Sequence, residues 1–342
     1  MRALALPAAL SLALALAACD GERKPGPTFT FVPVAGMSCA DGSPTGVGLS
    51  RGGDAVLVFL NGGGACWAAG ACDASAGPFG APELTLAEPL VTGTILDRNL
   101  PGNPFAGFTL VFVPYCTGDV HAGDSEGIYG GVTWRHHGRR NVQAALDWIA
   151  SSLPHPSRVV VAGSSAGGFG ALLSYDLVRA RWPEGSTPPV GAALVDDSGP
   201  TFVATAIPAA LRNAWWDAWN LASTVTPSCP TCQDDLSALW PVLSGAYPGD
   251  RFALLSTTHD ATMRAFFGGM VGSEFEGALG ELAQVVIEPL PNARTFRVGD
   301  PARATDHALL AAPALYSAQG TSLPGWLAPL ATGTGAFTSA GP

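Results

Sequence analysis

Six short apolar runs constrain the fold of this chain more than any other feature. They occupy residues 55–60, 109–113, 158–161, 191–195, 252–256 and 293–298. Most are apolar on both faces, which is typical of strands in a parallel sheet covered by helices. Between them, residues 141–153 and 166–181 place apolar side chains at helical spacing. This alternation predicts an α/β domain with a mainly parallel central sheet and helices on both faces.

Length and composition set broader limits. The chain has 342 residues, of which 47% are apolar and 13% charged, so it can bury a large core and is not disordered. Its formal net charge is −10, and lysines and arginines form no cluster. A nucleic-acid partner is therefore not expected.

The first residues resemble an export signal. Arg2 is followed by an apolar run over 3–16, which ends in the order Leu-Ala-Ala-Cys at 16–19, similar to a bacterial lipobox. We expect a lipoprotein signal peptide at 1–18, a lipid on Cys19 that inserts in the bilayer, a tether at 19–30 and a single domain with insertions at 31–342. The protein would then be extracytoplasmic, on the periplasmic or cell-surface side. An ordinary signal peptide with a chance cysteine is the alternative.

Six further cysteines follow this signal, and an even number behind an export signal favours disulfides. Cys229 and Cys232 form a C-x-x-C pair in a loop rich in threonine, proline and serine. A zinc site needs two more ligands, and there is no second C-x-x-C. A short structural disulfide is the better interpretation of this pair, and no metal is expected.

The segment Gly-Ser-Ser-Ala-Gly at 163–167 lies between a predicted strand and a predicted helix. This is the G-x-S-x-G pattern of a nucleophile elbow, with Ser165 at its centre. Such a turn is strained and presents the hydroxyl at the carboxyl edge of the sheet, where open α/β folds bind ligands. A glycine-rich nucleotide loop is the alternative, but the segment lacks the lysine and the glycine spacing of such loops.

A nucleophilic serine needs a base, and α/β-hydrolases carry their triad in the order serine, acid, histidine. His307 follows the last predicted strand, and Asp260 follows the strand before it. We therefore expect an α/β-hydrolase fold in which Ser165 attacks, His307 transfers the proton and Asp260 orients the imidazole. The rival acids Asp196, Asp197 and Asp300 remain open.

The loop after the first predicted strand carries three glycines at 62–64. Its backbone N–H groups predict an oxyanion hole built from the amides of Gly64 and Ala65, with Ala166 after the nucleophile as the further donor. Asp119 and His121 follow another strand and either border the site or form a hydrogen-bonded loop pair.

Two aromatic segments, 215–219 and 266–267, either line an acyl or sugar pocket or form a helix packing stripe. Sequence spacing does not distinguish these alternatives.

Several segments, in order, resemble the pectin acetylesterase and Notum family of serine carboxylesterases. They are Cys-Ala-Asp-Gly-Ser-Pro at 39–44, Leu-Asn-Gly-Gly-Gly-Ala-Cys-Trp at 60–67, Tyr-Cys-Thr-Gly-Asp at 115–119, Gly-Ser-Ser-Ala-Gly-Gly at 163–168 and Asp-Asp-Ser-Gly at 196–199. The resemblance implies the same triad and disulfides Cys39–Cys116 and Cys66–Cys72. The chain differs from the family pattern at Trp67, which follows the cysteine of the glycine loop instead of preceding it. Trp67 is a candidate for the substrate pocket.

The resulting hypothesis is a serine carboxylesterase that needs no cofactor and cleaves acyl or acetyl esters, on a polysaccharide or a small molecule, through an acyl-enzyme. Two alternatives stay open. One is a catalytically inert surface lipoprotein of the same fold that binds glycan or acyl ligands. The other is a serine peptidase.

Overall fold

The computed structural model describes residues 28–72 and 77–342. The predicted signal peptide at 1–18, the lipidation site Cys19 and the tether up to residue 27 lie outside the described residues. The expected tether extends too far, because Phe29 is buried and Thr30 already begins the first strand. Within the described part of the chain, no helix is both long and apolar enough to cross a membrane.

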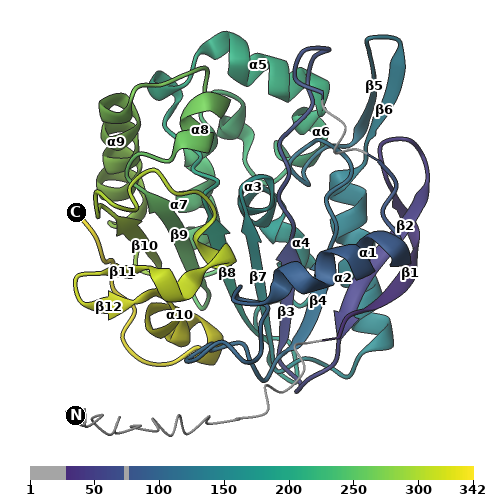
Figure 1. The fold of residues 1–342 in the computed structure, drawn as a ribbon, viewed down its shortest axis with the longest axis horizontal. Helices are drawn as coiled ribbons and strands as arrows, with labels where there is room; N and C mark the ends of the chain where they lie inside the picture. Colours follow the sequence, from purple (N-terminus) through teal and green to yellow (C-terminus); the bar gives the residue numbers. More distant parts are fainter. Residues whose placement is uncertain (1–27, 73–76) are drawn as a thin grey trace, which may run out of the picture.

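An eight-stranded sheet forms the centre of the molecule (Figure 1). Its strand order is β1-β2-β4-β3-β7-β8-β9-β10. The pairs β1–β2 and β2–β4 are antiparallel, and every pair from β4 to β10 is parallel. All six predicted runs are strands of its parallel part. They are β3 (Val56–Leu60), β4 (Thr109–Val113), β7 (Arg158–Ser164), β8 (Gly191–Asp197), β9 (Arg251–Thr257) and β10 (Ala293–Val298).

The antiparallel strands were not predicted from the sequence. β1 (Thr30–Ser38) contains Pro33 and Gly36, and its register with β2 (Pro44–Ser50) shifts between Pro33 and Ser38. Proline and glycine are unfavourable in regular strands, so the segment lacks a strand signal. Two hairpins outside the main sheet were missed for a similar reason, since their strands are short and partly exposed. They are β5 (Ser125–Tyr129) with β6 (Val132–His136), and β11 (Ser317–Ala318) with β12 (Thr321–Ser322).

Alternate residues of each parallel strand pack into two different hydrophobic clusters, one on each face of the sheet. On β3, Val56, Val58 and Leu60 belong to one hydrophobic cluster, while Leu57 and Phe59 belong to another. The first cluster is covered by α2 to α9, and the second by α1 and α10 (Figure 1). Helices therefore cover both faces of the sheet, as predicted, and the arrangement is an α/β-hydrolase fold.

The helices have the following bounds: α1 Ala81–Ala87, α2 Gly138–Ser152, α3 Ala166–Leu173, α4 Tyr175–Arg181, α5 Ala209–Ala218, α6 Leu221–Thr224, α7 Leu239–Ala246, α8 Ala261–Phe266, α9 Gly272–Glu281 and α10 Leu323–Thr332. Short 3₁₀ turns include η2 (Glu88–Val91) and η7 (Leu309–Ala311), and η6 (Leu282–Ile287) is a π-helix. The predicted helix over 166–181 is interrupted at Ser174, whose hydroxyl donates to the carbonyl oxygen of His121 at 3.0 Å.

Three disulfides join Cys39 to Cys116, Cys66 to Cys72 and Cys229 to Cys232, the same pairs that were expected. The first closes a loop of 77 residues between β1 and the end of β4. In the chain-entropy model, a loop of this length stabilises the fold by about 4.5 kcal/mol. The second fixes the segment directly after the glycine loop.

Candidate active site

Ser165 occupies a strained turn between β7 and α3. Its φ of 59° and ψ of −121° lie outside the regions that L residues usually adopt, at a cost of about 1–3 kcal/mol. The turn is possible because its glycines lack side chains. A Cβ on Gly163 would lie 2.1 Å from the carbonyl oxygen of Gly167, and one on Gly167 would lie 1.9 Å from that of Leu60. The amide of Ser165 donates to the carbonyl oxygen of Asp197 at 2.7 Å, which ties the turn to β8.

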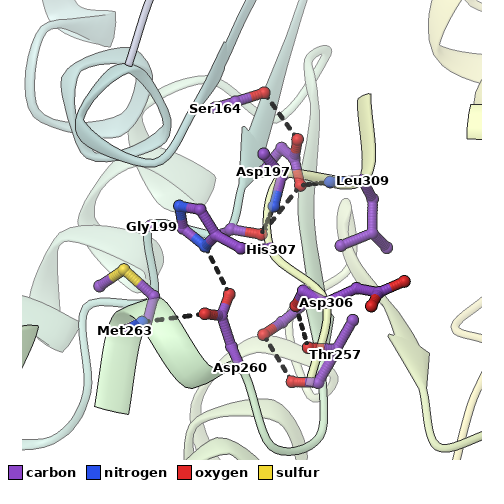
Figure 2. Close-up of polar contacts among 12 residues, drawn as sticks. Ser164, Asp197, Gly199, Thr257, Asp260, Met263, Asp306, His307 and Leu309 are labelled. Atoms are coloured by element: carbon purple, nitrogen blue, oxygen red, sulfur yellow. Dashed lines mark hydrogen bonds and ion pairs between the residues drawn. The ribbon is translucent and has the colours of Figure 1, made fainter. Parts of the chain in front are cut away.

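His307 and Asp260 meet at the same edge of the sheet (Figure 2). His307 Nδ1 lies 2.7 Å from Asp260 Oδ2. The other carboxylate oxygen of Asp260 accepts the amide of Met263 at 2.9 Å, so Asp260 also caps the start of α8. Asp260 is the partner of the imidazole among the four candidate acids.

Backbone hydrogen bonds join the loop after β9, which carries Asp260, to the loop after β10, which carries His307. The amide of His259 donates to the carbonyl oxygen of Ala304 at 2.8 Å, and that of Ala261 donates to the carbonyl oxygen of Thr305 at 3.2 Å. The two donors flank Asp260 in the sequence, and the two acceptors lie shortly before His307. The carboxylate and the imidazole are therefore positioned by their main chains as well as by their own bond.

Several effects act on the pKa of His307. Burial lowers it, but the hydrogen bond and negative charge of Asp260 and the charge of Asp197 outweigh burial, so the pKa is raised above its ordinary value of 6.5. The environment thus favours the imidazolium that a general base becomes after it takes a proton.

Ser165 and His307 line one cavity of about 490 Å³. The cavity continues from these residues along the sheet face that α1 and η2 cover, and most of its wall is apolar. Its aromatic side chains are Phe29, Phe59, Phe79 and Phe112. Phe59 and Phe112 are register partners on adjacent parallel strands, and their rings stack with centroids 6.4 Å apart. Sequence reasoning missed these four residues, although the penultimate phenylalanines of two neighbouring strands could have identified two of them.

The glycine loop passes directly beside Ser165. Gly62, Gly63 and Gly64 line the same cavity, and a Cβ on Gly62 would lie 3.1 Å from the Cβ of Ser165. Gly63 and Gly64 have φ values of 152° and 70°, which favour glycine. Ala65 instead packs against the larger core, while Ala166 begins α3, where amides lack helical partners.

Asp119 and His121 lie behind the glycine loop and are buried. Nε2 of His121 donates to the carbonyl oxygen of Asn61 at 2.8 Å, and burial lowers the pKa of this histidine. Asp119 accepts the amide of Gly138 at 2.6 Å and the hydroxyl of Thr117 at 2.6 Å. The cavity wall does not include Asp119 or His121. His121 binds the residue that precedes the glycine loop, and Asp119 in turn accepts the amide of His121 at 3.2 Å.

Trp67 and the two aromatic segments form a cluster on the opposite side of the glycine loop. Trp67 contacts Trp215, Trp219 and Phe266 edge-on, with ring centroids 5.6 to 6.5 Å apart. Trp215 also stacks on Phe266 at 4.9 Å. This cluster packs within the larger core, and none of its members lines the cavity of Ser165.

Three features define the class of this protein as an α/β-hydrolase. They are the elbow at Ser165, the order of serine, acid and histidine along the chain, and the strand order of the sheet. The Pectinacetylesterase family model matches residues 24–203, just over half of the sequence. The chain belongs to the pectinacetylesterase family, which includes pectin acetylesterases and Notum proteins. The matched region contains the glycine loop and Ser165, whereas Asp260 and His307 lie beyond it.

Curated relatives agree with this family. The chain is 32% identical over 169 residues to human palmitoleoyl-protein carboxylesterase NOTUM, a match that covers 48% of this chain and 34% of the human protein. It is 29% identical over 160 residues to pectin acetylesterase 4 of Arabidopsis thaliana, covering 44% and 39%. The chain thus spans little more than a third of the length of these relatives. The crystal structure of the Wnt deacylase Notum from Drosophila shares the fold, with a TM-score of 0.63, 21% identity and coverage of 90% and 93%.

Replacing Asp260 with Asn should lower the pKa of His307, because the amide removes the negative charge while it can still accept the amide of Met263. Since the folded pKa is raised, the pair stabilises the fold most below pH 6.5, and this contribution is lost as pH rises through the folded pKa. NMR titration of ¹³C-labelled histidines measures the shift directly. An unchanged titration of His307 in Asp260→Asn would contradict the pairing.

Proposed function

We propose that this chain is a serine carboxylesterase in which Ser165, His307 and Asp260 act as a catalytic triad. The observation that carries the proposal is the 2.7 Å bond between His307 and Asp260 at the cavity that Ser165 also lines. The strained elbow and the carboxylesterases among the relatives support it.

The proposed reaction has two halves. Ser165 Oγ attacks the ester carbonyl carbon while Nε2 of His307 takes the hydroxyl proton, and the imidazolium then protonates the leaving alcohol. Water enters, gives its proton to His307 and attacks the acyl-enzyme, which releases the acid and returns the proton to Ser165. Asp260 keeps Nδ1 protonated and oriented throughout.

The developing oxyanion requires backbone donors. We assign this role to amides of the glycine loop at Gly64 and Ala65 and to the amide of Ala166. Gly64 lines the cavity and Ala166 follows the nucleophile, which supports two of the three. His121 binds Asn61 beside the glycine loop, and Asp119 binds Gly138 at the start of α2. We therefore propose a supporting role for them instead of contact with substrate.

The apolar cavity favours an acyl chain longer than acetyl. It extends from Ser165 past Leu84, Val91 and Leu96 under α1 and η2. Each buried methylene contributes about 0.8 kcal/mol, or roughly fourfold in binding. We therefore propose that the acyl group of the ester enters this cavity and that the alcohol remains at its mouth.

We also propose that the protein acts outside the cytoplasm, anchored by a lipid on Cys19. The three disulfides support an oxidising compartment. In a bacterial host that processes lipoproteins, Cys19→Ser should move the protein from the membrane fraction to the soluble fraction. Wild-type protein found wholly in the soluble fraction would contradict the anchor.

Ser165→Ala should abolish hydrolysis of p-nitrophenyl esters, with a loss of at least about 10⁴-fold in kcat, because the attacking oxygen is gone. Wild-type protein should also be labelled by a fluorophosphonate, which reacts only with an activated serine, and the variant should not. A wild type that neither turns over esters nor reacts with the probe would favour the inert binding protein. Cleavage of amides in preference to esters would favour a peptidase.

A tryptophan at Ala87 should shorten the accepted acyl chain. Ala87 is half-buried on α1 and lines the cavity, whereas Leu86 beside it is 77% exposed and points away. Ala87→Trp should lower kcat/KM for p-nitrophenyl octanoate relative to acetate by about tenfold or more, and Leu86→Trp should leave this ratio near that of wild type. A wild-type preference for acetate would exclude the acyl-chain assignment.

A further inference from the structure

Asp197 is a buried carboxylate at the catalytic edge that the proposed proton transfers do not use. It is the last residue of β8 and lies opposite Ser164 in the parallel register of β7 and β8. Its side chain is fully buried. A carboxylate in such a place is costly unless several donors satisfy it, so its partners indicate what it does.

Four donors point at the two oxygens of Asp197, and they come from both sides of the site (Figure 2). Oδ2 accepts the hydroxyl of Ser164 at 2.7 Å and the amide of Leu310 at 2.9 Å. Oδ1 accepts the amide of Leu309 at 2.9 Å and the hydroxyl of Ser198 at 3.1 Å. One side chain thus connects the residue before the nucleophile with the segment after the general base.

Ser198 extends this connection by one residue. Its hydroxyl oxygen accepts the amide of Ala308, the residue directly after His307, at 3.1 Å. Three successive amides, at 308, 309 and 310, therefore end on Asp197 or Ser198. Ala308 and Ser198 both have φ near 60°, a conformation that residues other than glycine rarely adopt. These hydrogen bonds stabilise that conformation.

We propose that Asp197 is a positioning residue that fixes His307 relative to Ser165 by binding the chain on both sides of the pair. The inference rests on the proposed esterase function, since it assigns Asp197 a part in that reaction without contact with substrate. Asp260 fixes the orientation of the imidazole. Asp197 fixes the distance between the loop that carries His307 and the elbow that carries Ser165.

Charge contributes a second, separable effect. The charged groups that act on His307 are Asp260, before α8, and Asp197, at the end of β8. Both raise the pKa of the imidazole against burial, which lowers it. Burial raises the pKa of Asp197 itself, while Ser164, the two loop amides and His307 oppose that rise.

The neighbouring Asp196 provides a matched control. It is equally buried, but among the described residues only its Oδ1 has a partner, the amide of Gly199 at 2.9 Å, and its Oδ2 accepts no hydrogen bond from them. Burial and the adjacent Asp197 raise its pKa well above the ordinary value. An asparagine at 196 keeps an oxygen for the amide of Gly199 and breaks no second hydrogen bond, whereas at 197 its NH₂ group would face donors.

The test compares Asp197→Asn with Asp196→Asn in the full chain. Asp197→Asn should lower kcat by about 10- to 100-fold with little change in KM, because the loop that carries the base is displaced. The acidic limb of its kcat/KM profile should also move to lower pH. Asp196→Asn should keep the kcat and the profile of wild type. Equal effects of the two variants, or a lower kcat with an unmoved acidic limb, would overturn the proposal.

A second measurement keeps this inference separate from the proposed function. In the Ser165→Ala background, which needs no turnover, the ¹³C-histidine titration of His307 should move to lower pH on Asp197→Asn and stay in place on Asp196→Asn. If Asp197→Asn does not fold, Ser198→Ala tests the proposal instead, because it removes the hydrogen bond to Ala308 and keeps the carboxylate of Asp197. It should lower kcat several-fold without moving the acidic limb, and wild-type activity of Ser198→Ala would then overturn the positioning role.

Discussion

The close approach of three backbone segments, β3, β7 and the start of α3, is the constraint on which the site depends. Gly163 and Gly167 leave no room for a side chain between these segments. The turn can only be this tight if Ser165 accepts a positive φ, and the amide of Ser165 then points at β8. The strain is therefore balanced by sheet packing on both sides, and it places Ser165 where the glycine loop can pass beside it.

Much of this arrangement follows from the sequence, for a simple reason. In a parallel sheet, all carboxyl ends lie at one edge, so residues directly after different strands converge whatever their separation along the chain. Ser165 follows β7, Asp260 follows β9 and His307 follows β10. Each strand was recognisable as an apolar run, and the order of the three residues then predicted the pairing of His307 with Asp260.

The parts that the sequence did not reveal depend on side-chain packing instead of strand order. Asp197 was a rival for the catalytic acid, and no local pattern shows that its donors come from 164, 198, 309 and 310. The aromatic wall of the cavity combines Phe29, which precedes β1, with Phe59 and Phe112 from inner strands. Likewise Trp215, Trp216 and Trp219 lie at helical spacing, which is equally compatible with a pocket and with the core cluster in which they lie.

The two faces of the sheet have different roles. The face under α2 to α9 carries the larger core, the aromatic cluster of Trp67 and the buried His121, which binds the carbonyl oxygen of Asn61 beside the glycine loop. The other face is covered by α1, η2 and α10, and the cavity lies there. The glycine loop is thus held from the larger core, whereas Leu309 and Leu310, which bind Asp197, belong to the cluster on the cavity side. Part of the cavity wall comes from α1 and η2, which are far from the elbow in the sequence. If an acyl group enters this cavity as we propose, changes in α1 and η2 would alter the acyl preference while the elbow stays the same. This fits a family whose members' names record groups as different as acetyl and palmitoleoyl.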